Sequence, residues 1–378
     1  MDRIVSAYMS NVTKTPRNLR HVAVRGFKSI KELDLDMGPV NILIGANGAG
    51  KSNFISLFTF LSRLSLGQLR TYVEQQGFAD TFFHFGSKNT PTIEVDLEVA
   101  YNGYHVAFVQ GADDTLVIKS ELCVFVPALR AFRLSGKNGE SGLLPGSVTR
   151  NESVRDSTRE YLQRCRVYHF HDTGSSAGFK KAQRLSASDY LYQDAANLAP
   201  FLYRLMQEEP NSYREIVSAV QTVAPFFQDF VFEPRGPEGE ERLLLKWRNR
   251  NDEHPFSAAQ ISDGTARFIC LATLFLQPPH LSPDTIVLDE PELGLHPAAL
   301  VVLAELIQSA ARERQVICST QSVALANLFA PEDFIVVDQV KGVSTFRRPD
   351  PGALRDWLED YGMGDLWSKN LIGGRPEW

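Results

Sequence analysis

Continuous apolar runs predict three strands that are buried inside the fold. They span residues 40–44, 285–288 and 316–322, and they are rich in valine and isoleucine. Short β-branched runs of this kind are typical of buried strands. Residues 53–61, shortly after the first run, have apolar side chains at helical spacing. The pattern therefore predicts an α/β fold that contains a strand–loop–helix unit.

A second region predicts antiparallel strands. Residues 92–99 alternate apolar and acidic side chains, which indicates a half-exposed strand. Residues 104–109 and 115–125 continue the β pattern, and the Asn-Gly pair at 102–103 is typical of a hairpin turn. Residues 133–157 are rich in glycine, serine and charge, which predicts a mobile loop.

Other parts of the chain have patterns typical of both strands and helices. It predicts a strand at residues 165–170, helices at 195–206 and 213–223, and one short helix at 353–361. Because no heptad repeat is sustained in the chain, we expect no long coiled coil, and any helical arm is reduced to a short insertion.

Composition limits the kind of protein. The chain has 378 residues, of which 43% are hydrophobic and 22% charged, so it can bury a large core. Its net charge of -6 argues against a nucleic-acid partner held by overall charge, but it allows a local basic patch. Four cysteines lie far apart without a C-x-x-C pair, which predicts reduced core thiols in a cytoplasmic protein. We find no apolar stretch long enough for a membrane span and no apolar signal region.

The loop after the first buried strand carries the most specific motif. Residues 45–52 read GANGAGKS and match G-x-x-x-x-G-K-[ST] at every fixed position. Its glycines let backbone N–H groups turn towards an anion, and the N-terminus of the next helix adds partial positive charge. In such a loop Lys51 reaches the β- and γ-phosphates and the Ser52 hydroxyl ligates Mg²⁺. The motif therefore predicts binding of ATP with Mg²⁺.

The second buried strand ends in two carboxylates. Asp289 would hold Mg²⁺, directly or through water, and Glu290 would orient the attacking water. A strand end with two solvated carboxylates is the common alternative, so the catalytic interpretation depends on the neighbouring segments.

Two further segments accompany these motifs. Residues 262–264, Ser-Asp-Gly, precede an apolar helical run, where serine is a typical N-cap. Taken alone, they indicate only the start of a helix. The third buried strand ends near Gln321, which is either a polar cap on the strand or a group that contacts the nucleotide.

With these segments in this order, the chain resembles the ABC-type ATPase heads of the RecF, SMC and OLD lineage, and more narrowly the small RecF-like AAA-type ATPases. The resemblance implies a two-lobed P-loop NTPase fold with an antiparallel β subdomain and a helical insertion. It extends from about residue 20 to the end of the chain. The segments that carry it are residues 24–30, 45–53, 167–172, 289–297 and 371–376.

By this resemblance, two heads pair head to tail around two ATP molecules, and hydrolysis separates them. Ser262 and Gly264 of one head would cap the γ-phosphate held by the other, and residues 292–296 would form the D-loop at the same interface. The implied ATP-binding residues are Asn47, Gly48, Ala49, Gly50, Lys51, Ser52, Asn53, Ser262 and Gly264. The implied Mg²⁺ ligands are Ser52 and Asp289, and the implied catalytic residues are Glu290, Gln321 and Lys51.

Two positions depart from the family pattern. Asp263 stands where the signature of these ATPases has its first glycine, and a carboxylate there repels a γ-phosphate unless it points away. Gln321 replaces the usual switch histidine, and its amide can donate a hydrogen bond but cannot carry a proton. This second departure predicts slow turnover.

Several weaker signals remain open. His169, His171 and Asp172 either form a zinc site or, by the resemblance, belong to a Q-loop that contacts Mg²⁺ or water. Basic side chains that could contact DNA, or that are simply solvated, are Arg25, Lys28, Arg130, Arg133 and Lys137.

The resemblance also divides the chain. We expect a flexible N-terminus at 1–19, lobe I with the phosphate loop at 20–130, a loop and helical insertion at 131–240, lobe II at 241–348 and a C-terminal tail at 349–378.

Two functions follow as expectations. The first is an ATP-hydrolysing switch in DNA repair, DNA-end sensing or antiphage defence, with a homodimer and double-stranded DNA as candidate partners. The alternative is a slowly hydrolysing regulatory subunit that gates a separate nuclease or toxin effector. No membrane partner is expected, and the short tail leaves no room for the nuclease domain of OLD-type enzymes.

Overall fold

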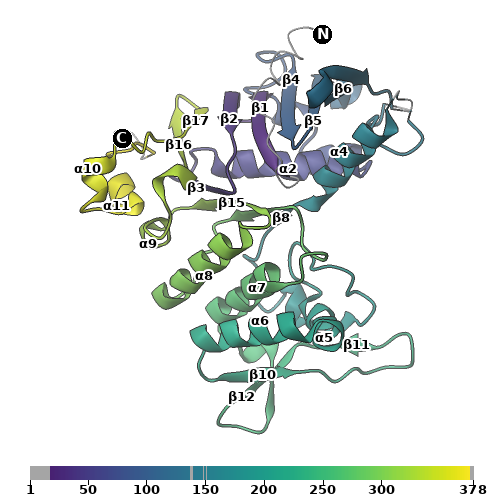
Figure 1. Cartoon of the computed structure of the whole chain (residues 1–378). Helices are drawn as coiled ribbons and strands as arrows, with labels where there is room; N and C mark the ends of the chain where they lie inside the picture. Colours follow the sequence, from purple (N-terminus) through teal and green to yellow (C-terminus); the bar gives the residue numbers. More distant parts are fainter. Residues whose placement is uncertain (1–17, 137–138, 148, 150, 375–378) are drawn as a thin grey trace.

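Two six-stranded sheets with a helix between them form the upper half of the molecule (Figure 1). The computed structural model describes residues 18–136, 139–147, 149 and 151–374. One sheet is mostly parallel and the other is antiparallel, and α2 (Lys51–Ser65) lies between them. Helices and two small sheets extend from the other face of the parallel sheet.

The parallel sheet contains the three buried strands that the apolar runs predict. Its strand order is β17-β16-β3-β15-β14-β8, in which β17 is antiparallel to β16 and the other neighbours are parallel. The predicted strands correspond to β3, β14 and β15, so the three strands are confirmed, although the third ends at Thr320, two residues before the predicted end. The bounds are β3 (Val40–Ile44), β8 (Cys165–Tyr168), β14 (Thr285–Asp289), β15 (Gln315–Thr320), β16 (Phe334–Val340) and β17 (Val343–Arg347).

Alternate side chains of the parallel strands enter two different cores. Leu43, Val287 and Ile317 pack with α2 and the antiparallel sheet, whereas Ile42 and Ile286 pack with the helices on the opposite face. This division follows from the period of two in a strand, and it explains why the runs are apolar at consecutive positions. The sheet that carries the predicted motifs is therefore held rigidly from both sides.

The antiparallel sheet covers α2 with one face and exposes the other. Its strand order is β2-β1-β4-β5-β6-β7. The half-exposed strand predicted at 92–99 is confirmed as β4, in which Val95 and Leu97 are buried. The bounds are β1 (Leu19–Phe27), β2 (Ile30–Asp36), β4 (Ile93–Val99), β5 (Asn102–Gln110), β6 (Leu116–Phe125) and β7 (Arg130–Arg133).

The hairpin turn predicted at 102–103 is wrong. Asn102 and Gly103 belong to β5, and the turn consists of Ala100 and Tyr101, with Ala100 in the left-handed region at φ 49°. Both strand residues pair with β4 on one side and with β6 on the other, so the ladder outweighs the local preference for an Asn-Gly turn.

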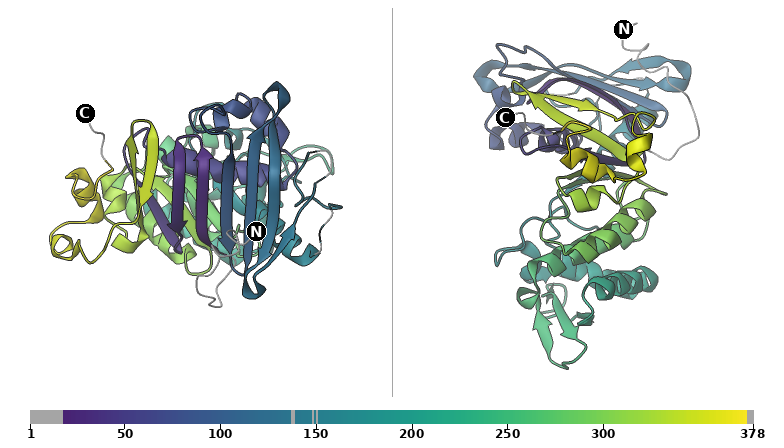
Figure 2. Two further views of the ribbon diagram at one scale, coloured as in Figure 1. Left: turned by 90° about the horizontal axis from the view of Figure 1, so that it is seen from above. Right: turned by 90° about the vertical axis from the view of Figure 1, so that its left-hand side faces the viewer.

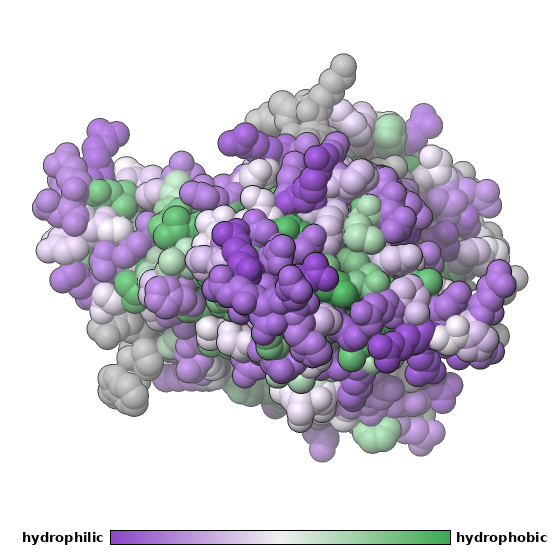
Figure 3. Space-filling view, turned by 90° about the horizontal axis from the view of Figure 1, so that it is seen from below, coloured by the Kyte–Doolittle hydropathy of each residue, from purple (hydrophilic) through white to green (hydrophobic). Residues whose placement is uncertain are grey.

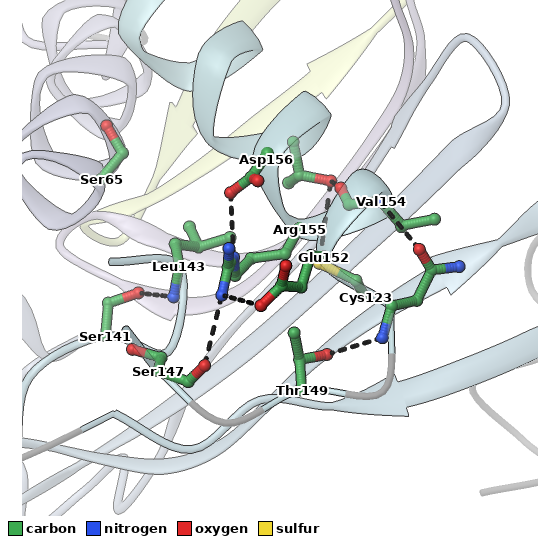
Figure 4. Close-up of polar contacts among 12 residues, drawn as sticks. Ser65, Cys123, Ser141, Leu143, Ser147, Thr149, Glu152, Val154, Arg155 and Asp156 are labelled. Atoms are coloured by element: carbon green, nitrogen blue, oxygen red, sulfur yellow. Dashed lines mark hydrogen bonds and ion pairs between the residues drawn. The ribbon is translucent and has the colours of Figure 1, made fainter. Parts of the chain in front are cut away.

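The loop predicted at 133–157 extends too far into the chain. Helix α4 (Glu152–Arg164) begins inside it, because the Asn151 side chain accepts a hydrogen bond from Val154 N at 3.2 Å. Figure 4 shows Arg155 of this helix donating to the Ser147 carbonyl at 3.2 Å and to Asp156 at 2.9 Å. Residues 137, 138, 148 and 150, which also fall in the predicted loop, lie outside the described residues.

Helices cover the lower face of the parallel sheet in Figure 1. The predicted helices at 195–206 and 213–223 correspond to α5 and α6, whereas the predicted strand at 165–170 ends earlier, at Tyr168. A small sheet of order β10-β12-β13 forms the far end of the molecule (Figure 2). These elements are α5 (Leu198–Glu208), α6 (Pro210–Val223), α7 (Asp263–Leu276), α8 (Pro297–Ala310), β10 (Phe227–Val231), β12 (Lys246–Asn249) and β13 (Pro255–Ser257), with β9 (Gln183–Arg184) and β11 (Arg242–Leu243) paired nearby.

The helices are short throughout the part of the chain that the structure describes, where the longest spans 15 residues, so no long coiled coil occurs there. None of those helices is long and apolar enough to cross a membrane. Seen from the far end, the surface is mainly hydrophilic, with apolar side chains in separate patches (Figure 3).

The C-terminal region contains two short helices where one was predicted at 353–361. They are α10 (Arg355–Leu358) and α11 (Met363–Ser368), and α11 packs against α9 (Val323–Ala326). α10 lies inside the predicted range, and α11 follows it. Between them, a Cβ at Gly362 would lie 2.4 Å from the Asn327 Oδ1 atom. Helix α3 (Leu69–Gln75) lies beside α2.

The four cysteines are free and buried, as predicted. Burial raises the pKa of Cys123 and of Cys270 to about 12, so both thiols stay protonated at neutral pH.

Candidate functional site

The parallel register brings the predicted motifs to one edge of the sheet. β15 lies between β3 and β14, with Thr320 opposite Ile44 and Ser319 opposite Asp289. The carboxyl ends of parallel strands meet at the same edge, which is where α/β sheets bind ligands. The glycine loop, the two carboxylates and Gln321 therefore converge, although more than half of the chain separates the first from the others.

The glycine loop leaves room for an anion at the start of α2. Gly50 precedes the helix at φ 115°, and no side chain caps the first turn. Gly48, at φ 78°, is exposed, and a Cβ there would meet nothing within 4 Å. Free N–H groups at a helix start beside an open backbone loop fit a phosphate. The shape of the loop therefore fits the phosphates of ATP, the predicted ligand.

Lys51 is folded back on this loop. Its side chain is 4% exposed, and Nζ donates to the carbonyl oxygens of Gly45 at 2.7 Å and Ala46 at 3.0 Å. Burial lowers the pKa of Lys51, and the nearby carboxylates of Glu290 and Asp289 oppose that shift. The lysine thus lies in the electrostatic range of both acids, and its contact with phosphates stays a prediction.

The two carboxylates are held by the neighbouring strand. The Ser319 hydroxyl donates to Asp289, and Glu290 N donates to the Ser319 carbonyl at 3.1 Å. Gln321 Nε2 donates to Glu290 Oε1. Glu290 has φ 44°, a left-handed conformation that costs a non-glycine residue about 1–2 kcal/mol. Such strain collects at functional sites, and here it belongs to the predicted base.

Glu292 also belongs to this site, although the resemblance implies for it only a place in the D-loop. Its side chain is 8% exposed, and Oε1 accepts from Thr320 Oγ1 at 2.6 Å and from Gln321 N at 3.0 Å. Burial raises the pKa of Glu292. The sequence signal that could have predicted this role is the presence of a third carboxylate two residues after the acidic pair. Glu292 therefore fixes the backbone of the residue that contacts Glu290.

Replacing Glu292 with alanine is expected to lower the free energy of unfolding by about 1–3 kcal/mol, because the buried Thr320 hydroxyl and the half-buried Gln321 N–H lose their acceptor. Glutamine keeps an acceptor and removes the buried charge, so Glu292→Gln should be at least as stable as the wild type at pH 7.5. Because burial raises the pKa of Glu292, its ionised carboxylate destabilises the folded protein. This destabilisation is complete above the raised pKa and absent below the ordinary value of 4.5, where the group is protonated in both the folded and the unfolded protein.

The check is denaturant unfolding of the three proteins at pH 7.5 and at pH 4.5. The advantage of Glu292→Gln over the wild type should shrink at the lower pH. An alanine variant as stable as the wild type would contradict the assigned hydrogen bonds.

The signature segment begins α7. Ser262 is exposed and its hydroxyl accepts from Thr265 N at 3.3 Å, so the predicted N-cap is confirmed. The Asp263 carboxylate, 69% exposed, lies 3.6 Å from Lys180 Nζ. The carboxylate that departs from the family pattern is therefore paired with a cation. A Cβ at Gly264 would lie 2.4 Å from the Gly294 carbonyl, so the signature turn touches the predicted D-loop.

Arg267 joins the signature helix to the segment predicted as a Q-loop. It is 8% exposed and donates to the carbonyls of Phe170 at 2.8 Å and His171 at 3.1 Å. Asp172 accepts from Gly174 N at 3.0 Å, within its own turn. Within residues 18–136, 139–147, 149 and 151–374, no group of three or more His, Cys, Asp or Glu side chains could hold a metal ion. The zinc alternative therefore lacks a ligand set there.

The basic residues considered for DNA are partly neutralised. Arg25 pairs with Glu32 at 3.2 Å and with Glu94 at 3.7 Å. Lys28 Nζ donates to Ser56 Oγ at 2.9 Å and lies over the ring of Phe82. Arg130 and Arg133 are exposed on β7, and Lys137 lies outside the described residues.

Comparison with known proteins identifies a family and similar folds. The family described as "AAA domain, putative AbiEii toxin, Type IV TA system" matches residues 40–99 and 147–327, which is more than half of the chain. A search of curated proteins finds no match.

Solved structures with a similar fold are SMC heads. One is the SMC head bound to the C-winged helix domain of ScpA, with a TM-score of 0.56 and 18% identity over 89% of this chain and 99% of that one. Another, from Pyrococcus furiosus, is the Smc head domain with an extended coiled coil bound to the C-terminal domain of ScpA. Its TM-score is 0.52 at 17% identity, over 90% of this chain and 98% of that one. At these identities the likeness concerns the fold.

The chain therefore belongs to the AAA-domain family whose description names the AbiEii toxin, and it has the fold of the ABC-type ATPase heads of the RecF and SMC lineage.

Proposed function

We propose that the protein is a Mg²⁺-dependent ATPase whose two heads pair around ATP and separate after hydrolysis. The observation that carries the proposal is the parallel register, which brings the glycine loop after β3 and the carboxylates of Asp289 and Glu290 to one edge of the sheet. A lysine, a glycine loop and two carboxylates at one edge are what phosphoryl transfer to water requires.

Each residue has a proposed task at this edge. Backbone groups of residues 47–53 bind the phosphates of ATP. Lys51 leaves the loop carbonyls and contacts the terminal phosphates. Bound by Ser52 and Asp289, Mg²⁺ would neutralise charge on the phosphates. Glu290 orients the attacking water and accepts its proton. Gln321 donates to Oε1 of Glu290 in this structure, and the second carboxylate oxygen is left to accept from the attacking water.

Pairing of heads would use the exposed signature turn. Replacing Ser262 with arginine is expected to prevent the ATP-dependent dimer while leaving ATP binding to the monomer, because a long cation would occupy the contact surface. The measurement is light scattering after size exclusion, with and without ATP, in a Glu290→Gln background that keeps ATP intact.

The matched control is Ser218→Arg on the exposed side of α6. Loss of the Ser262 N-cap lowers the free energy of unfolding by about 1 kcal/mol. The melting temperatures of both variants are therefore measured in parallel. A Ser262→Arg protein that dimerises like the control would contradict head pairing through the signature.

A slowly hydrolysing subunit that gates a nuclease or toxin effector is the second candidate. The contact between Gln321 and Glu290 favours it, because that contact occupies one carboxylate oxygen of the predicted base. The matched family's description names a toxin and a toxin–antitoxin system, which also points to an effector.

Steady-state hydrolysis with and without linear duplex DNA separates the two candidates. A rate that rises with DNA supports a role in DNA repair, DNA-end sensing or antiphage defence. A very low rate that ignores DNA supports the effector-gating subunit.

A further inference from the structure

The C-terminal end of the described chain contacts the glycine loop. The Gly374 carbonyl accepts a hydrogen bond from Ala46 N at 2.7 Å. The carbonyl of the same residue, Ala46, accepts from Lys51 Nζ at 3.0 Å. Two adjacent peptide groups of the loop are thus held, one by the chain end and the other by the lysine.

Several side chains hold this end in place. Trp367 Nε1 donates to the Gly374 carbonyl at 3.0 Å, and Gly374 N donates to Asp338. Arg347 donates to the Ile372 carbonyl, and Ile372 is 4% exposed. The indole of Trp367, the carboxylate of Asp338 and the guanidinium of Arg347 therefore together hold residues 372–374 so that the last carbonyl faces the loop.

The backbone here also requires glycine. Gly374 has φ 81°, and a Cβ there would lie 3.0 Å from Trp367 Nε1. Gly373 has φ 73°, and a Cβ there would lie 2.6 Å from an Arg347 nitrogen. Any other residue would be strained at both positions, so this fold of the chain end is specific.

The neighbouring hairpin supports the same loop. A Cβ at Gly45 would lie 2.3 Å from the Val337 carbonyl of β16, and Gln339 Nε2 donates to the Gly48 carbonyl at 2.8 Å. All of these supporting residues follow residue 327, where the match to the family ends. The support of the glycine loop therefore comes from outside the matched region.

We propose that Trp367 and Gly374 are positioning residues of the ATP site, and that docking of the chain end holds the glycine loop in its ATP-binding form. This rests on the proposed function, because it assumes that the loop binds ATP. Coupling between two equilibria is reciprocal, so bound ATP must also stabilise the docked chain end by the same factor.

The test compares Trp367→Phe, which keeps a partly buried aromatic ring but loses the N–H donor, with Trp357→Phe as matched control. Trp357 is 47% exposed on α10. We expect Trp367→Phe to weaken binding of N-methylanthraniloyl-ATP about 3- to 10-fold, which is the net effect of one hydrogen bond. The control should bind like the wild type.

Two measurements keep the outcomes distinct. A Trp367→Phe protein with a lower melting temperature but wild-type affinity would overturn the inference, because the chain end would then be only structural. Hydrogen exchange of residues 366–374 should slow on ATP addition, and unchanged exchange would also overturn it. If the wild type itself binds no ATP, the proposed function fails instead.

Discussion

Replacing Glu290 with glutamine is expected to lower kcat for ATP hydrolysis by about 10²–10⁴-fold, the usual contribution of a general base. Glutamine has nearly the same size and keeps an acceptor, but it cannot take a proton from the attacking water. The hydrogen bond that Glu290 N donates to the Ser319 carbonyl is a backbone contact and should persist. ATP affinity should therefore stay close to that of the wild type, with the loss confined to the chemical step.

The matched control is Glu305→Gln, the same change on the exposed side of α8. Phosphate release is measured under saturating ATP for all three proteins, and binding of labelled ATP is measured in parallel. Equal rates for the wild type and Glu290→Gln would exclude Glu290 as the base. If both rates were also very low and indifferent to DNA, the effector-gating subunit would be the better description.

Local sequence patterns made the elements around the glycine loop predictable. The strand at 40–44 and the helix at 53–61 have patterns that do not depend on distant residues, and they appear as β3 and within α2. Ser262 caps α7 through a contact three residues away, which a sequence pattern can contain. The edge position of Asp289 then follows from the parallel arrangement of the buried strands.

Contacts between distant segments were not predictable in the same way. The turn at Ala100 is set by pairing of β5 with two neighbours, and this outweighed a strong local signal. Burial of Glu292 depends on its position beside Thr320 of another strand. The hydrogen bond from Ala46 N to the Gly374 carbonyl joins two segments that lie far apart in the sequence, and no local pattern predicts it. Such contacts are decided by tertiary packing, which the pattern of one segment does not contain.

Replacing Lys51 with alanine is expected to remove about half or more of the stabilisation that ATP gives the protein. Loss of a charged donor to a phosphate should weaken binding about 10- to 100-fold. At ATP equal to about 100 times the wild-type Kd, ligand stabilisation would fall from ~2.7 kcal/mol to between ~1.4 and ~0.4 kcal/mol. The observable is the ATP-induced rise in melting temperature, followed across an ATP titration.

We expect Lys51→Ala to change the free energy of unfolding measured without ATP much less than it changes the stabilisation that ATP adds. Burial lowers the pKa of Lys51, so the folded protein bears a cost for the charged ammonium at neutral pH, and the variant is free of that cost. Against this, the carbonyls of Gly45 and Ala46 lose their donor. Lys119→Ala, at an exposed position of β6, is the matched control and should keep the full ATP response. If Lys51→Ala kept that response as well, the ammonium would not contact the phosphates, and nucleotide binding would have to depend on the backbone of the loop alone.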